Sequence, residues 1–189
     1  AELLSATALG SALDYALGAS GFGPLLRARR VLERMNQVPW GRAMHALSPF
    51  LARLGDPVAG FNFHPDNAEA ALVRAVYSNA FTAIPTALLG SLATGLEQGG
   101  LKSRAGEPFQ AKAGALKTPL LMIAASDDRQ CPLEALEATA VATRAKVLRF
   151  GSRYGHRAEY GHFDLLLGRH APDEVWPAVL QWLLDVKPG

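Results

Sequence analysis

Seven consecutive apolar residues decide the fold of this chain, and they read Pro119-Leu120-Leu121-Met122-Ile123-Ala124-Ala125. The run has the length of a strand and does not alternate with polar residues, so we expect both of its faces to be buried. Strands with two buried faces are typical of parallel sheets, which helices cover on both sides. The run therefore predicts a central strand of an α/β fold.

The residues after this run alternate between helical and strand patterns. A strand–helix–strand unit normally crosses over right-handed into parallel pairing, so we expect the second strand to lie beside the first. Apolar residues of the last helix are expected on one inward face, which comprises Val175, Trp176, Val179, Leu180 and Leu183. The elements expected are a helix over residues 132–144, a strand over 146–150, a loop over 151–161 and a helix over 172–186.

The first 116 residues read as helices and loops, with no strand. Apolar residues at helical spacing predict a first helix, and these are Leu3, Leu4, Ala8, Leu9, Leu13, Ala16 and Leu17. Further helices are expected from Pro24 and over residues 42–54, 68–81 and 86–98, with loops at 55–67 and 101–117. Two strands do not make a stable parallel sheet. We therefore expect residues outside this chain to complete the sheet, from an N-terminal half or a second chain.

Composition excludes several classes of protein. Of 189 residues, 49% are apolar, which is enough for a sizeable core, and a net charge of +2 is too small to indicate nucleic-acid binding. The charge-free run at residues 76–96 contains Pro85 and is read as two helices, not as a transmembrane segment. The single cysteine, Cys131, excludes an internal disulfide. The single cysteine, together with the lack of a signal-peptide pattern in the sequence, favours a cytoplasmic location. The chain lacks an initiating Met and reads as processed, truncated or separated from upstream residues.

Candidate site residues follow both predicted strands. Asp127 and Asp128 lie in the turn Ser126-Asp127-Asp128-Arg129-Gln130-Cys131-Pro132, and the loop after the second strand carries His156 and His162. In open α/β sheets the carboxyl ends of parallel strands meet at one rim, where ligands bind. An Asp that accepts from one ring nitrogen of a His leaves the other nitrogen to take a proton from a nucleophile. We therefore expect an acid–base pair at this rim.

Both turns resemble those of α/β-hydrolases. The stretch from Pro119 to Pro132 is similar to the penultimate strand and acid turn of that family, in which an Asp stands four residues before a Pro. The stretch Tyr160-Gly161-His162-Phe163-Asp164-Leu165-Leu166-Leu167-Gly168 resembles the histidine turn of the acid-lipase-like branch. The resemblance implies that Asp128, not Asp127, is the catalytic acid, and that His162 is the catalytic base, with His156 as the alternative.

The resemblance also implies a domain organisation and an activity. Residues 1–116 would form the helical lid that such lipases and esterases insert between strands six and seven. Residues 117–189 would form the C-terminal part of the core, so the chain would be a partial α/β-hydrolase. The activity implied is cleavage of carboxylic esters, with an acyl-ester small molecule or a lipid as substrate and no cofactor.

The sequence departs from the family in one essential respect. The nucleophilic Ser of these enzymes lies on a strand-to-helix elbow with the pattern Gly-x-Ser-x-Gly, and this pattern does not occur here. The stretch Gly18-Ala19-Ser20-Gly21-Phe22 comes nearest and fails at its last position. The oxyanion hole, which includes the N–H after the nucleophile, is missing with it. We therefore expect the nucleophile to lie outside this chain.

Alternatives remain open. The fold could persist as a non-catalytic binding module, or the same geometry could serve thioester cleavage or acyl transfer. His156, His162, Asp164 and His170 match none of the short zinc-binding spacings, so no metal site is predicted. Asp164 is instead expected to bond local backbone and hold the histidine turn. Cys131, although it lies near a helix start, is read as a packing residue.

Overall fold

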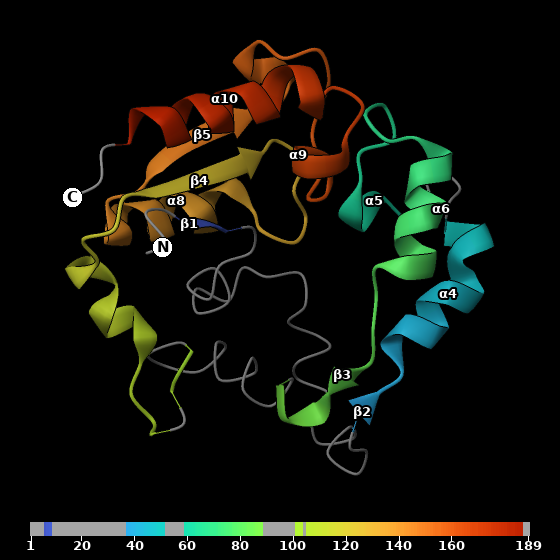
Figure 1. Ribbon diagram of the computed structural model, residues 1–189, viewed down its shortest axis with the longest axis horizontal. Helices are drawn as coiled ribbons and strands as arrows, with labels where there is room; N and C mark the ends of the chain where they lie inside the picture. The colour runs from blue at the N-terminus through green and yellow to red at the C-terminus, as the bar shows by residue number, and fades with distance from the viewer. Residues whose placement is uncertain (1–5, 9–36, 52–58, 89–100, 104, 187–189) are drawn as a thin grey trace.

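The computed structural model describes residues 6–8, 37–51, 59–88, 101–103 and 105–186, and it contains a parallel sheet (Figure 1). Its three strands are β1 (Ala6–Ala8), β4 (Leu120–Ala125) and β5 (Lys146–Phe150), in the order β1-β4-β5. Both pairings are parallel, and the register joins Ala6 to Leu120 and Ala125 to Phe150. The two strands predicted downstream are therefore confirmed, β5 with the expected bounds and β4 beginning one residue after the start of the apolar run, at Leu120.

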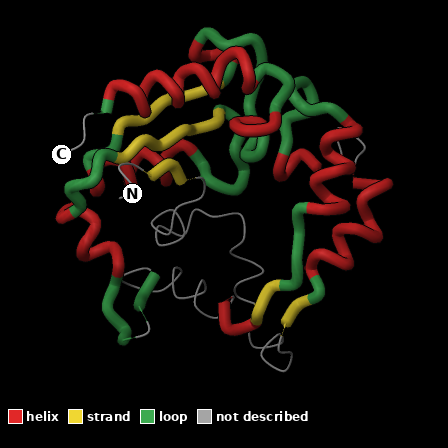
Figure 2. Tube along the Cα trace, in the orientation of Figure 1, coloured by secondary structure: helices red, strands yellow, loops and turns green. Residues whose placement is uncertain are grey.

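Helices cover both faces of β4 and β5. Helix α10 (Ala171–Asp185) lies on one face and α8 (Leu133–Thr143) on the other (Figures 1 and 2). Alternate residues of β4 divide between two clusters: Leu121 and Ile123 pack with α10, while Met122 and Ala124 pack with α8. Because every residue from Leu121 to Ala125 is buried, the expectation of a strand with two buried faces is confirmed.

Strand β1 corrects two expectations. Residues 6–8 are a strand, not part of a helix, and they pair in parallel with β4. The inference that the first 116 residues contain no strand beside β4 was therefore wrong. The physical reason is that β4 has two hydrogen-bonding edges, of which β5 occupies one. A segment of only three residues is enough to pair with the other edge. The other residues of the predicted first helix, and the helix predicted from Pro24, lie outside the described residues.

The part of the chain between β1 and β4 is mostly helical where it is described. Helix α4 (Trp40–Leu51) packs on α6 (Ala70–Asn79), around a core that includes Phe63 and Tyr77. These two helices confirm the predictions for residues 42–51 and 68–81 with shifted bounds, and residues 52–54 of the first prediction lie outside the described residues. The structure adds α5 (Ala59–Asn62), the 3-10 helix η2 (Phe109–Ala115), and the antiparallel strands β2 (Gln37–Val38) and β3 (Ile84–Pro85).

The predicted helix over residues 86–98 is helical at 86–88, and its remainder lies outside the described residues. The charge-free run that begins at Val76 leaves helix α6 after Asn79 and enters β3 at Ile84. None of the described helices has the length and apolar content that a membrane crossing requires.

The residues that follow β5 form short helices and then α10. The predicted loop holds the 3-10 helix η3 (Ser152–Tyr154), and the histidine turn continues into α9 (Asp164–Leu167).

The inward face of α10 differs from the predicted one. Val175 and Trp182 are buried, whereas Trp176, Leu180 and Leu183 are exposed by 51%, 56% and 44%. Helix α10 carries apolar residues of its own on more than one side, so their spacing alone does not single out the face that packs on the sheet.

The packing of α10 predicts unequal effects of two truncations. Trp182→Ala should lower the free energy of unfolding by about 3 kcal/mol or more, because it removes a large side chain from the core. Leu184→Ala, on the same helix with Leu184 73% exposed, is the matched control and should change stability by about 0.5 kcal/mol or less. Urea unfolding measures both, and equal losses would contradict the assigned face.

Candidate functional site

The candidate site forms where β4 and β5 end. Main-chain hydrogen bonds continue the pairing beyond the strands: the N–H of Ser126 donates to the carbonyl of Phe150 at 2.9 Å, and the N–H of Asp127 donates to the carbonyl of Tyr160 at 2.9 Å. The acid turn (residues 126–132) and the histidine turn (residues 160–168) are thereby held against each other. Their side chains meet at the rim that the sequence predicted.

Asp128 and His162 are in direct contact. The Oδ2 atom of Asp128 lies 2.8 Å from Nδ1 of His162, and the side chains are only 4% and 9% exposed. The other carboxylate oxygen, Oδ1, accepts the N–H groups of Gln130 and Cys131, both at 2.8 Å. Because an ionised carboxylate only accepts hydrogen bonds, Nδ1 of His162 must carry the proton. In the neutral ring, Nε2 is then the basic nitrogen.

The two alternative residues are engaged elsewhere. Asp127 lies 3.7 Å from Arg129, and its side chain is 38% exposed. The ring of His156 packs against Phe150 at 4.8 Å, and its Nδ1 lies 3.2 Å from the carbonyl oxygen of Gly151. The structure thus brings Asp128 and His162 together and gives Asp127 and His156 local contacts.

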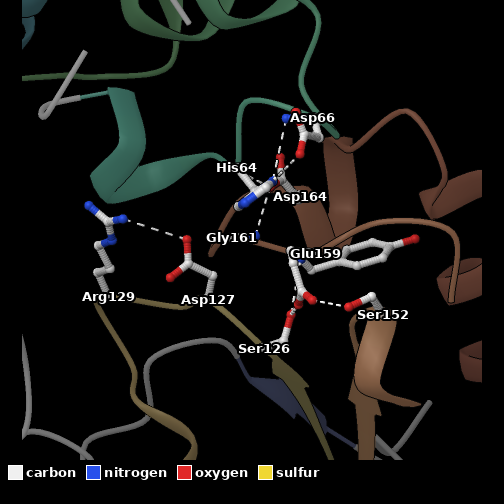
Figure 3. A network of polar contacts seen from close by, with 10 residues as sticks. His64, Asp66, Ser126, Asp127, Arg129, Ser152, Glu159, Gly161 and Asp164 are labelled. Carbon is white, nitrogen blue, oxygen red and sulfur yellow. Dashed lines mark hydrogen bonds and ion pairs between the residues drawn. The ribbon is translucent and has the colours of Figure 1, made fainter. Parts of the chain in front are cut away.

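Asp164 holds the histidine turn closed, as expected from the sequence. Its Oδ2 accepts the N–H of Gly161 at 2.7 Å and the N–H of His64 at 2.6 Å (Figure 3). Burial raises the pKa of the Asp164 carboxyl to about 6, although both N–H donors act to lower it. The contact with His64 reaches 100 residues back along the chain, and no local pattern in the sequence indicates it.

The carboxylate of Glu159 joins the loop after β5 to the end of β4. Glu159 accepts hydrogen bonds from the hydroxyls of Ser126 and Ser152, and these donors hold its pKa below the ordinary value (Figure 3). A Cβ at Gly151 would lie 2.2 Å from Oγ of Ser126, and φ at Gly151 is +151°, so this position needs glycine. Sequence reasoning missed this network because its members share no periodic spacing.

Tyr160 and Glu174 fix the histidine turn to α10. The Tyr160 hydroxyl donates to Glu174 Oε2 at 2.6 Å, and the N–H of Arg157 donates to Oε1 at 3.0 Å. Burial and the neighbouring Glu174 raise the pKa of Tyr160. Burial acts to raise the pKa of Glu174 as well, but these two hydrogen bonds hold it below its ordinary value. The histidine turn is thereby held on its α10 side.

Asn67 fixes the far end of the histidine turn. Its main-chain carbonyl accepts the N–H of Arg169 at 2.6 Å, and its side-chain Oδ1 accepts the N–H of His170 at 3.1 Å. Both bonds join the part of the chain before β4 to the start of α10. The turn that carries His162 is therefore held at both ends.

The remaining candidates have structural surroundings. Cys131 is 3% exposed and packs with Met122 and Leu136, in agreement with a packing role. Among the described residues, no group of three or more His, Cys, Asp or Glu side chains is arranged to hold a metal ion.

Comparisons of the chain with protein-family models, with curated proteins and with solved structures gave no match. The resemblance to α/β-hydrolases therefore rests on the residues of the two turns and stays a prediction.

The raised pKa of Asp164 predicts how stability depends on pH. The pKa is about 6 in the folded chain against an ordinary value of 3.8, so the folded state binds the proton more tightly. Stability from this group is complete below about pH 4 and is lost as pH rises through 6, by on the order of 2–3 kcal/mol. Asp164→Asn should remove this loss, which urea unfolding at a series of pH values measures.

Asp173→Asn is the control for that measurement, because Asp173 is an exposed carboxylate that pairs with Arg157 at 2.9 Å. It should keep the wild-type dependence on pH. If Asp164→Asn also kept it, the carboxyl would not be the group that titrates.

Proposed function

We propose that this chain supplies the acid and the base of a serine-type hydrolase that cleaves carboxylic esters. The observation that carries the proposal is the buried contact of 2.8 Å between Asp128 Oδ2 and His162 Nδ1 at the ends of two parallel strands. The order of acid and then His along the chain is the one that α/β-hydrolases use.

The reaction assigns one role to each residue. His162 Nε2 takes the proton of a serine hydroxyl while the serine oxygen bonds to the ester carbonyl carbon. Asp128 stabilises the imidazolium that forms. The imidazolium then gives this proton to the departing alkoxide, which leaves an acyl-serine. Water then hydrolyses the acyl-serine in the same two steps. His162 takes a proton from the water while the water oxygen bonds to the acyl carbon, and the imidazolium then returns this proton to the serine oxygen as the carboxylic acid product leaves.

The nucleophile is proposed to lie outside this chain. The pattern Gly-x-Ser-x-Gly is missing from the sequence. Ser126, the serine within the acid turn, donates its hydroxyl to Glu159. Strand β1 forms one edge of the described sheet, and such an edge accepts a further strand. We propose that an N-terminal half or a second chain pairs there and brings the serine and the oxyanion hole.

An acyl ester, including a lipid, is the proposed class of substrate. Residues 9–119 are inserted between β1 and β4, which lie side by side in the sheet, and a lid inserted between neighbouring strands is what the family resemblance implies. The described part of this insertion exposes apolar side chains suited to an acyl chain, namely Leu47, Phe50 and Leu88. The predicted division into a lid (residues 1–116) and a C-terminal part of the core (residues 117–189) then changes in one respect: residues 6–8, as strand β1, belong to the core sheet.

The test uses the protein in its native form, with intact mass and N-terminal sequencing to establish what accompanies residues 1–189. Hydrolysis of p-nitrophenyl esters and of the matching acyl thioesters is measured in parallel. His162→Gln and Asp128→Asn should each lower kcat by about 10³–10⁴-fold, because the serine loses its base or the base loses its orientation.

His156→Gln is the matched control and should retain the wild-type kcat. Full activity in His162→Gln would exclude the assigned base. A native protein that hydrolyses neither esters nor thioesters would favour a non-catalytic binding module, and a preference for thioesters would favour the thioesterase alternative.

A further inference from the structure

Asn62 contacts both turns of the candidate site. Its side-chain Oδ1 accepts a hydrogen bond from Gln130 Nε2 at 2.6 Å, and its main-chain carbonyl accepts the N–H of Phe163 at 2.8 Å. Gln130 also donates its own N–H to Asp128, and Phe163 directly follows His162. One residue at the end of α5 therefore reaches the neighbours of both the acid and the base.

Asn62 is itself held in place. Its Nδ2 donates to the hydroxyl of Tyr77 on α6 at 2.5 Å. Asn62, Gln130 and Tyr77 are exposed by only 8%, 7% and 1%. Hydrogen bonds between buried polar groups fix geometry strongly, because losing one partner leaves the other unsatisfied away from water.

The backbones of the two segments are also in close contact. A Cβ at Gly161 would lie 2.8 Å from the main-chain nitrogen of His64 and 2.9 Å from the carbonyl carbon of Phe63. Only a glycine allows residues 63–64 to approach the histidine turn this closely. The same approach permits the bond of 2.6 Å from the His64 N–H to Asp164.

We infer that Asn62 is a positioning residue that sets the distance between Asp128 and His162. The inference rests on the proposed function in so far as this pair is catalytic. It also divides the predicted lid: residues 59–67 are a fixed support of the site, joined to it through Asn62, His64 and Asn67.

The test compares three substitutions. Asn62→Leu keeps the size of the side chain but removes the bonds to Gln130 and Tyr77. Asn62→Asp is the conservative variant, because a carboxylate accepts from both the Gln130 amide and the Tyr77 hydroxyl. Asn79→Leu is the matched control on α6, where the side chain of an exposed Asn donates to the carbonyl of Ala75.

Two readouts are used: the downfield proton resonance of His162 Nδ1, and the kcat and KM of the native protein on p-nitrophenyl esters. Asn62→Leu should broaden or abolish the resonance and lower kcat by about 10–100-fold with little change in KM, because the base is displaced from its productive position. Asn62→Asp should restore most of both, and Asn79→Leu should change neither. Gln130→Leu, which removes only one of the two side-chain bonds, replaces Asn62→Leu if that variant does not fold.

Failure of the inference is distinct from failure of the proposed function. The inference is overturned if Asp128→Asn abolishes the resonance while Asn62→Leu and Gln130→Leu leave the resonance and kcat unchanged. It is also overturned if Asn79→Leu has the same effect as Asn62→Leu. If the resonance responds as expected but the native protein hydrolyses no ester, the positioning role stands and the proposed function fails.

Discussion

The parallel pairing of β4 with β5 is the constraint on which the site depends. Its register places Ala125 beside Phe150, so the acid turn and the loop leading to the histidine turn leave the sheet at the same rim. Had the strands been antiparallel, the two turns would lie at opposite ends of the sheet. The pairing is stabilised on both faces, by α10 through Val175 and Trp182 and by α8 through Leu136 and Ala140.

Carboxylates provide most of the order within the site. Asp128 accepts from two main-chain N–H groups and the His162 ring, Asp164 from two further N–H groups, and Glu159 from two hydroxyls. Each one joins segments that are separate in sequence, and each acceptor would be costly to leave unsatisfied. The candidate base is therefore held by a connected network that spans the acid turn, the histidine turn and the segment around α5, which is the kind of preorganisation that proton transfer requires.

The local parts of this arrangement were predictable from the sequence, and the long-range parts were not. The apolar run at 120–125 and the strand at 146–150 follow from composition and spacing, and turn chemistry places acidic residues and histidines at the rim of the sheet. The choice of Asp128 and His162 over Asp127 and His156 came from the resemblance of the two turns to those of α/β-hydrolases. Strand β1 is only three residues long and has no strand pattern of its own, so its pairing with β4 depends on the finished sheet. Asn62 bonds to Gln130 across 68 residues and His64 to Asp164 across 100 residues, and no periodicity in the sequence records such contacts.

The central claim is that Asp128 and His162 serve a serine that this chain does not contain. The most direct test is to label the native protein with a fluorophosphonate, which reacts with activated serines, and to map the modified peptide. The account predicts a labelled serine outside residues 1–189 and loss of labelling in His162→Gln. A label on Ser126 or on any other serine of this chain would contradict it.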